Sequence, residues 1–410
     1  MLPSQFFDIL LYNAANAGHC SLSQSSCEIF EKFGIVISKQ AYDERFDDTA
    51  VDFVKSIFEE QFSKQLQGIV HPELLKKFTR VRIKDGTRYK LPERLKDQFK
   101  GYGGKHASKA GICIQFEFDL KNNEILDLAP THAISSDSRD ALAKVDDIKK
   151  GELVIRDLGY FSLEVIQTII QKEAYIISRL NTQTLVYNQN NEELSFKELY
   201  RWMKKYGITQ IDKQVFIGQD HKIPVRLVMD IVPDEVYQER LQRIEKYNRK
   251  KRHQTTDEYK ARARFNLFIT NVEPEDFPTE TIYILYKIRW QIELTFKVWK
   301  SVCGIDKLQP MKYERFICTL YAKFIIILIN NQLINIIQNR MYQKFQKLLS
   351  KIKCFKTLQM YFAKTRDTLL NTPKRLNYLI QDIANMFSRN HWLEKRKGRI
   401  NYIEIIELFI

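Results

Sequence analysis

The amino-acid sequence predicts an α/β protein whose core is interrupted by a mostly β insertion and flanked by helical N- and C-terminal regions. Three observations predict this class. Strand-like and helix-like segments alternate between residues 76 and 180, further strand-like segments follow up to residue 275, and both ends of the chain have helical periodicity. A chain of 410 residues is long enough for several domains. The predicted regions are 1–75 (helical), 76–180 (core, first part), 181–275 (insertion), 276–330 (core, second part) and 331–410 (helical and basic).

The N-terminal region is expected to form separate helices. Leu2–Ala17 and Gln24–Phe33 have helical periodicity, Gly34 breaks the pattern, and Ser38 is a suitable N-cap for a following helix. Two helices joined by a short turn are typical of a helix-turn-helix, whose second helix enters the major groove of DNA. They are equally typical of a small helical bundle, so both readings stay open.

The region from residue 76 to 180 has a recognisable order of elements. A strand is predicted from residue 78 to the turn signal Asp85-Gly86. The next elements are two strands, a helix, a strand, a helix and a strand, at 110–119, 124–129, 136–145, 153–156, 162–171 and 175–178. Three leading strands followed by helix, strand, helix and strand are the order of a ribonuclease H-like domain. Asp85 and Asp157 are then expected at the ends of the first and fourth strands.

The insertion, residues 181–275, contains strand candidates at 184–187, 215–218, 223–232 and 264–270. Between the last two lies a charged segment, 239–262, with the basic run Arg249-Lys250-Lys251-Arg252. Such a run is either a solvated surface or a DNA contact, and the sequence does not decide between them.

One helix is predicted to start at Pro278 and to stop near Gly304. At about 100° per residue, its positions 286, 289, 293 and 300 fall within a sector of about 60°. That face carries Tyr286, Arg289, Glu293 and Lys300, with Lys297 and Trp290 nearby. These six residues are the candidate site residues of the helix. The face is either a solvated side of an amphipathic helix or a site for a negatively charged substrate. Trp290 is expected either to stack on an unpaired base or to pack in the core.

The charge of the chain favours a polyanionic partner. The net charge is +15, and residues from 294 onward carry 21 Lys plus Arg against 7 Asp plus Glu. This asymmetry indicates a nucleic-acid or membrane surface. The six cysteines are not arranged in C-x-x-C pairs, which argues against a zinc centre and favours reduced thiols. No signal peptide is recognised, and Lys323 and Asn330 interrupt the apolar stretch 321–337, so a buried helix and a soluble intracellular protein with no membrane partner are expected.

The acids Asp85, Asp157 and Glu293 can be considered as one site. Three hard oxygen ligands without histidine or thiolate suit Mg²⁺ or Mn²⁺. Two such ions about 3.5–4 Å apart can activate an attacking hydroxyl and stabilise the departing oxygen of a phosphodiester. The sequence therefore leads to the hypothesis of a two-metal site for phosphodiester chemistry.

The residues at these positions resemble a known family. Tyr286, Arg289, Glu293 and Lys300 match the signature Y-(2)-R-(3)-E-(6)-K in full. Asp85-Gly86-Thr87 and Asp157-Leu158-Gly159-Tyr160 are similar to the motifs around the first two aspartates. The sequence thus resembles the DDE transposases of bacterial insertion sequences, in the subgroup that carries this signature (insertion sequence family four). The resemblance runs from about residue 30 to about residue 330, and the last 80 residues match no family motif.

This resemblance implies a ribonuclease H-like catalytic core that hydrolyses DNA at the ends of the element and then joins the freed 3′-hydroxyl to target DNA. It implies that Asp85, Asp157 and Glu293 hold two Mg²⁺ ions. The DNA-binding residues would be Tyr286, Arg289, Lys300, Lys297 and Trp290, with terminal inverted repeats and target DNA as partners. It also implies a homodimer on DNA, acting in the bacterial cytoplasm at the nucleoid.

Two alternatives stay open beside this reading. The first is a catalytically silent DNA-binding protein derived from a transposase, and the second is a two-metal DNA nuclease. The sequence GYGGKHASKAG at 101–111 lacks the spacing of a phosphate-binding P-loop, and reads either as a flexible loop or as a DNA contact.

Overall fold

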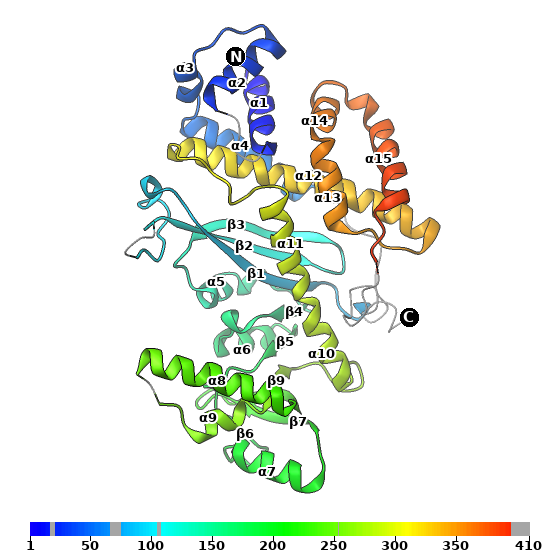
Figure 1. Cartoon of the computed structure of the whole chain (residues 1–410). Helices are drawn as coiled ribbons and strands as arrows, with labels where there is room; N and C mark the ends of the chain where they lie inside the picture. Colours follow the sequence, from blue (N-terminus) through cyan, green and yellow to red (C-terminus); the bar gives the residue numbers. More distant parts are fainter. Residues whose placement is uncertain (17–20, 66–74, 105–107, 253, 395–410) are drawn as a thin grey trace. The chain divides into compact units, whose positions relative to one another are not determined.

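A computed structural model describes residues 1–16, 21–65, 75–104, 108–252 and 254–394 of the chain (Figure 1). The chain forms two compact units. Unit 1 comprises residues 1–76, 85–135 and 291–410, and unit 2 comprises residues 77–84 and 136–290. Strand β1 (Val81–Lys90) contributes residues 81–84 to unit 2 and residues 85–90 to unit 1.

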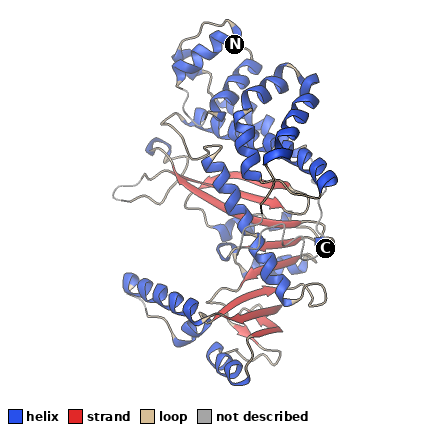
Figure 2. Ribbon diagram, turned by 45° about the vertical axis from the view of Figure 1, so that its right-hand side comes forward, coloured by secondary structure: helices blue, strands red, loops and turns tan. Residues whose placement is uncertain are grey.

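Unit 2 is built on a mixed sheet, whose strands are drawn in red in Figure 2. The strand order within the unit is β1-β4-β5-β9-β8-β7-β6, in which β1, β4 and β5 are parallel and the later neighbours pair antiparallel. Its strands besides β1 are β4 (Leu153–Arg156), β5 (Tyr175–Arg179), β6 (Val186–Tyr187), β7 (Gln210–Ile217), β8 (Ile223–Ile231) and β9 (Phe265–Thr270). Its helices are α5 (Asp137–Ala143), α6 (Leu163–Gln171), α7 (Phe196–Tyr206), α8 (Asp234–Lys251), α9 (Asp257–Arg262) and α10 (Thr279–Ile288), with 3₁₀ turns η3 (Val145–Asp147) and η4 (Leu158–Tyr160).

The parallel strands of unit 2 are short and apolar because both of their faces are covered. All four residues of β4 are buried, as are the three central residues of β5. Strands buried on both faces read as continuous apolar runs, which is why this part of the sheet was predicted correctly from the sequence. The β1–β4 ladder ends at the register pair Lys84↔Arg156, and Asp85 and Asp157 directly follow these two residues in the sequence.

Unit 1 combines a β-sheet portion with helices. Its strand order is β3-β2-β1, and β2 (Gly111–Asp119) and β3 (Glu124–His132) form an antiparallel hairpin in which all nine residues of β2 are buried. Its helices before the hairpin are α1 (Pro3–Ala15), α2 (Leu22–Phe33), α3 (Lys39–Glu44), α4 (Asp48–Ser63) and the short η2 (Glu93–Leu95). After the hairpin come α11 (Trp290–Ser301), α12 (Tyr313–Phe345), α13 (Lys351–Met360), α14 (Phe362–Asn371), η5 (Pro373–Arg375) and α15 (Leu376–Asn390).

The first N-terminal helices form where periodicity predicts them, and α3 begins at its predicted cap, Ser38. The Ser21 and Ser38 side chains accept hydrogen bonds from the backbone N–H groups at the starts of α2 and α3. Gly34 ends α2 with φ of +67°, a left-handed conformation that glycine adopts without steric cost. The groove-binding role of these helices stays a prediction.

Helix α12 is the longest in the described residues, and it is apolar enough by length and composition to cross a membrane. Its most apolar window has a mean hydropathy of 1.6, yet 83% of that window is buried inside the protein. The helix packs against α1 and α4, so its apolar surface is covered by its own chain. The prediction of a buried helix at 321–337 is confirmed.

Two predicted features differ from the structure. β1 does not end at a turn at Asp85-Gly86 but continues through these residues to Lys90. The reason is local: the Asp85 carboxylate accepts a hydrogen bond from the N–H of Gly86 at 2.8 Å, and Gly86 does not adopt a positive φ.

The insertion contains its predicted strands but also α7, α8 and α9. Helix α8 has no buried residue, and most of its length was interpreted from the sequence as a charged segment.

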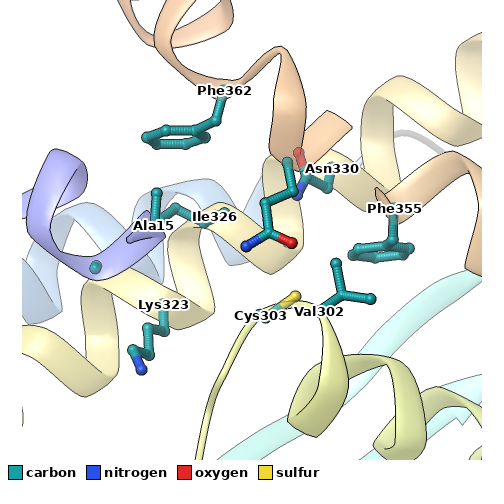
Figure 3. Close-up of a pocket in the computed structure, with 10 residues that line it drawn as sticks. Ala15, Val302, Cys303, Lys323, Ile326, Asn330, Phe355 and Phe362 are labelled. Carbon is teal, nitrogen blue, oxygen red and sulfur yellow. The ribbon is translucent and has the colours of Figure 1, made fainter. Parts of the chain in front are cut away.

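A buried lysine lies in the helical part of unit 1. Lys323 of α12 is 1% exposed, and its ammonium donates hydrogen bonds to the backbone carbonyl oxygens of Gly304 and Lys307. Lys323 and Cys303 both line a cavity of about 20 Å³, close to the volume that one water needs. Figure 3 shows the two residues among those that line this cavity. Burial lowers the pKa of Lys323 to about 8 and raises the pKa of the Cys303 thiol to about 12.

The lowered pKa of Lys323 makes the stability depend on pH. Below pH 8 the lysine is charged in both states, and the folded state carries the cost of desolvating the charge. Between about pH 8 and the ordinary pKa of 10.5, the unfolded state binds more protons, so this cost is relieved as pH rises. The free energy of unfolding of the wild type and of Lys323→Met is measured in urea at several pH values. We expect the wild-type value minus the variant value to rise by on the order of 1 kcal/mol per pH unit between pH 8 and 10. Parallel pH profiles of the two proteins would contradict this.

Candidate active site

The residues that the sequence predicts as a site fall into two groups, one in each unit. Asp85, Glu293, Lys297 and Lys300 line one pocket of unit 1. Asp157, Tyr286 and Arg289 contact one another in unit 2.

The pocket of unit 1 has a volume of about 540 Å³. Its walls are the middle of β1 and one side of α11, and it is lined by Asp85, Gly86, Glu293, Phe296, Lys297, Lys300 and Ser301. Two carboxylates and two ammonium groups therefore face one hollow. Gly86, Phe296 and Ser301 were not predicted as lining residues.

Aromatic packing determines which side of α11 faces this pocket. The Trp299 ring is 1% exposed and lies edge-on to the ring of Phe116 in β2, with centroids 4.6 Å apart. Phe296 contacts the same two rings at centroid distances of 5.8 and 5.6 Å. Because residues three and four apart share a helix face, burying Trp299 against β2 leaves Glu293, Lys297 and Lys300 on a common polar side. Aromatic burial of this kind contributes about 1.5–3 kcal/mol per side chain.

The helix that carries the signature is not continuous, which corrects the sequence prediction. Helix α10 ends at Ile288, α11 begins at Trp290, and Arg289 lies in a turn between them. The N–H of Arg289 bonds to the carbonyl oxygen of Tyr286, an i→i−3 bond in place of the i→i−4 bond of an α-helix. Arg289 itself keeps right-handed helical dihedral angles, with φ of −49° and ψ of −32°. The boundary between the compact units also falls here, between Trp290 and Gln291.

In unit 2, Asp157 accepts a hydrogen bond from the Tyr286 hydroxyl at 3.0 Å. The Nε of Arg289 lies 3.8 Å from the same carboxylate oxygen, and its guanidinium is 5.9 Å from the Tyr286 ring centroid. The Tyr286 ring in turn packs edge-on against Phe268 of β9, at a centroid distance of 4.9 Å. The Asp157 side chain is 41% exposed, so it is held by two neighbours and still open to solvent.

The Tyr286 hydroxyl is a stable hydrogen-bond donor. Burial raises its pKa above the ordinary value, and the negative charge of Asp157 raises it further. The phenol consequently keeps its proton at neutral pH, and its O–H donates a hydrogen bond to the Asp157 carboxylate.

The glycine after Asp157 has a packing reason. A Cβ at Gly159 would lie 3.3 Å from a carboxylate oxygen of Asp137, closer than ordinary contact. Gly159 lies in η4, which packs against α5, the helix that carries Asp137. The D-x-G spacing therefore lets the turn after Asp157 approach α5.

Two buried cations precede the two aspartates in the sequence, and sequence reasoning missed both. Lys84 is fully buried and pairs with Asp140 at 2.6 Å. Arg156 is 2% exposed, with its guanidinium 5.6 Å from the Tyr160 ring centroid. For Arg156 the available signal was a charged residue at the end of the otherwise apolar strand β4, which is unusual because an unpaired buried charge is costly. Lys84 gave no such signal, because it lies inside β1 among other charged residues.

The structure places Trp290 at the surface, with 53% of the residue exposed. The reading of Trp290 as a core residue is therefore wrong.

The donor set suits a hard cation. In the parts of the chain that the structure describes, no three His, Cys, Asp or Glu side chains are grouped closely enough to hold a metal ion. The unit 1 pocket supplies two carboxylates, Asp85 and Glu293, and no histidine or thiolate lines it. Carboxylate oxygens are the ligands that Mg²⁺ and Mn²⁺ prefer, so these residues fit such an ion chemically.

Comparison with known proteins gives one consistent family. Residues 76–329 match the family described as "Transposase DDE domain". The chain is 31% identical over 383 residues to the transposase for insertion sequence element IS231F of Bacillus thuringiensis subsp. israelensis, which covers 89% of this chain and 78% of that protein. It is 30% identical over 402 residues to the IS231C transposase of Bacillus thuringiensis subsp. berliner, with coverages of 92% and 83%. The IS1151 transposase of Clostridium perfringens is 26% identical over 426 residues, with coverages of 98% and 89%.

The matched family spans both aspartates, the glutamate and their neighbouring cations, and the relatives align over most of their length. The chain therefore belongs to the DDE transposases of bacterial insertion sequences.

Proposed function

We propose that this transposase cleaves DNA at the ends of its insertion sequence and transfers the cut strand, with Asp85, Asp157 and Glu293 as its catalytic acids. The observation that carries the proposal is the pocket in which Asp85 and Glu293 lie beside Lys297 and Lys300. A phosphodiester needs both groups: carboxylates to hold cations at the reacting phosphate, and ammonium groups to bind its charged oxygens.

The family generally uses divalent metal ions, and we infer two Mg²⁺ ions here, with Mn²⁺ as a substitute. Asp85, Asp157 and Glu293 would hold them. When bound, such ions activate the attacking oxygen and stabilise the departing one. The chain's own part is to supply hard oxygen donors beside the cations Lys297 and Lys300.

Tyr286 and Arg289 are inferred to position Asp157 and to bind DNA phosphates. Their contacts with the Asp157 carboxylate support the first role. A guanidinium can contact a phosphate through two parallel N–H groups, which supports the second role for Arg289. Lys297 and Lys300 act as point charges on the phosphate near the cut. Trp290 is inferred to stack on an unpaired base, and its exposure supports this role.

Further parts of the proposal rest on the family and on the described fold. The mixed α/β architecture and the parallel β1-β4-β5 strands support a ribonuclease H-like core. An insertion sequence has two ends, so we infer that two protomers pair on DNA, at the terminal inverted repeats and then at target DNA. We place this activity in the bacterial cytoplasm, at the nucleoid, without a membrane partner. The same proposal includes the division of the chain into the five regions predicted from the sequence. It also includes membership of the subgroup that carries the Y-(2)-R-(3)-E-(6)-K signature.

Glu293→Gln tests the catalytic assignment. The amide keeps the size of the side chain but removes the charge that would hold a cation. We expect wild-type protein with Mg²⁺ to cut a DNA fragment at the tip of the inverted repeats that flank the gene, and EDTA to stop the cutting. The variant should lose about 10³-fold or more in cleavage rate, since several kcal/mol of transition-state stabilisation are removed. Binding of the fragment should persist.

Glu280→Gln, at an exposed acid of α10, is the control and should cut normally. Normal cutting by Glu293→Gln would contradict the assignment. Binding without cutting by the wild type would point to a silent DNA-binding derivative. Cutting without regard to the repeats would point to a nuclease.

Lys300→Ala tests the phosphate role of α11. Loss of one phosphate contact should weaken end binding and reduce the slope of log K against log salt by about 0.9. Binding is measured by electrophoretic mobility shift between roughly 50 and 200 mM salt, the range in which phosphate contacts dominate the affinity. Lys374→Ala, at an exposed lysine of η5, is the matched control. An unchanged slope for Lys300→Ala would remove the phosphate role.

A double-mutant cycle tests the contact between Tyr286 and Asp157 independently of DNA. A hydrogen bond to a charged group contributes about 1.5–3 kcal/mol, so Tyr286→Phe and Asp157→Asn should be non-additive in urea unfolding by on the order of 1 kcal/mol. Asp146, an acid paired with Lys172, supplies the control: Tyr286→Phe and Asp146→Asn should be additive. Equal coupling energies in the two cycles would show that the contact contributes nothing specific.

A further inference from the structure

A second basic hollow of unit 1 lies outside the pocket that holds Asp85 and Glu293. It has a volume of about 540 Å³ and is lined by Lys96, Asp97, Lys100, Gly101, Tyr102, Gly103, Gly104, Lys109 and Ile134. Three lysines oppose one aspartate, and all three lysines are exposed. Tyr102 is 75% exposed and Ile134 is 47% exposed, although both are large apolar side chains.

The base of this hollow is a built structure. Lys100 and Ala110 form an isolated antiparallel bridge, and the N–H of Gly101 donates to the carbonyl oxygen of Lys109 at 2.6 Å. The Glu93 carboxylate accepts hydrogen bonds from the N–H of Lys109 at 2.7 Å and from the Ser108 hydroxyl at 3.1 Å. Hydrogen bonds therefore hold the backbone at Lys100, Gly101 and Lys109.

The glycines in this segment have steric reasons. A Cβ at Gly101 would lie 2.8 Å from a backbone carbon of Ala110, so no larger residue fits without a shift. Gly103 has φ of +66°, a conformation that other residues rarely adopt. A tight backbone that presents an exposed tyrosine among lysines matches the way proteins contact a nucleic-acid strand, with ammonium groups on phosphates and a ring on sugar or base.

The position of the hollow relative to Asp85 follows from β1. β1 continues past Asp85 to Lys90 and Leu91 follows it, so the six residue steps from Asp85 to Leu91 span about 20 Å at about 3.3 Å per step. The N–H of Leu91 donates to the carbonyl oxygen of Ala110, between Lys109 and the β2 strand. About 20 Å corresponds to about six base pairs of duplex DNA at 3.4 Å each.

We propose that this hollow is a second DNA-binding site, in which Lys96, Lys100, Lys109 and Tyr102 hold the backbone of the element's end about six base pairs from the cleaved bond. The inference rests on the proposed function, since the cleaved bond is placed at Asp85 and Glu293. It adds a contact that holds the DNA in register while the acids act. The lysines neutralise phosphates, and the Tyr102 ring covers the adjoining deoxyribose.

A triple variant tests the site: Lys100→Ala, Tyr102→Ala and Lys109→Ala together. The probe is a DNA fragment bearing the inverted repeats that flank the gene. We expect affinity to fall by roughly 10- to 100-fold, and the salt slope to become shallower by about 1.8, because two phosphate contacts are lost. In hydroxyl-radical footprinting, wild-type protein should protect the backbone about four to eight base pairs from the cut. The variant should lose this protection and keep the protection at the tip of the repeat.

The control is a second triple variant, Lys356→Ala, Lys374→Ala and Tyr378→Ala, whose tyrosine is 76% exposed. It should bind and protect DNA like the wild type, and Tyr102→Phe should also keep the footprint. If wild-type protein binds and cuts the repeat ends while the hollow variant matches it in affinity, salt slope and footprint, the second site is overturned and the catalytic proposal stands. If wild-type protein neither binds nor cuts these ends, both are overturned together.

Discussion

Strand β1 is the element on which the rest of this transposase depends, because it belongs to both compact units. Its first four residues pair in parallel with β4 inside unit 2, and the following residues belong to unit 1. The buried Lys84, paired with Asp140, strongly disfavours any slip of this strand, since a one-residue shift would expose a core face and leave a buried charge without its partner. Asp85 is therefore placed by a ladder that ends one residue before it.

The four-residue signature divides into two pairs with different contacts. Tyr286 and Arg289 contact Asp157, whereas Glu293 and Lys300 line the pocket that also contains Asp85. The turn at Arg289 separates the two pairs, so each pair is positioned by its own packing. Phe268 supports the first pair, and the contact of Trp299 with Phe116 supports the second.

The local signals in the sequence predicted every strand of the sheet but missed the helices α7, α8 and α9 of the insertion. The buried runs of β2, β4 and β5 and the serine cap of α3 were identified, because burial and capping leave a mark on neighbouring residues. Helix α8 buries none of its residues, and most of its length was treated as a charged segment. The Asp85-Gly86 pair was taken for a turn, although the strand continues through both residues and the N–H of Gly86 donates to the Asp85 carboxylate.

The sequence by itself determined the family, the identity of the candidate acids and cations, and the order of the strands, since spacing along the chain and burial patterns carry this information. Only the tertiary structure decided that Trp290 is exposed, that Lys84 and Arg156 are buried, and that the signature helix is interrupted at Arg289. It also decided that Asp85, Glu293, Lys297 and Lys300 share a pocket. These properties depend on contacts between residues far apart in the chain, and no local pattern of residues specifies such contacts.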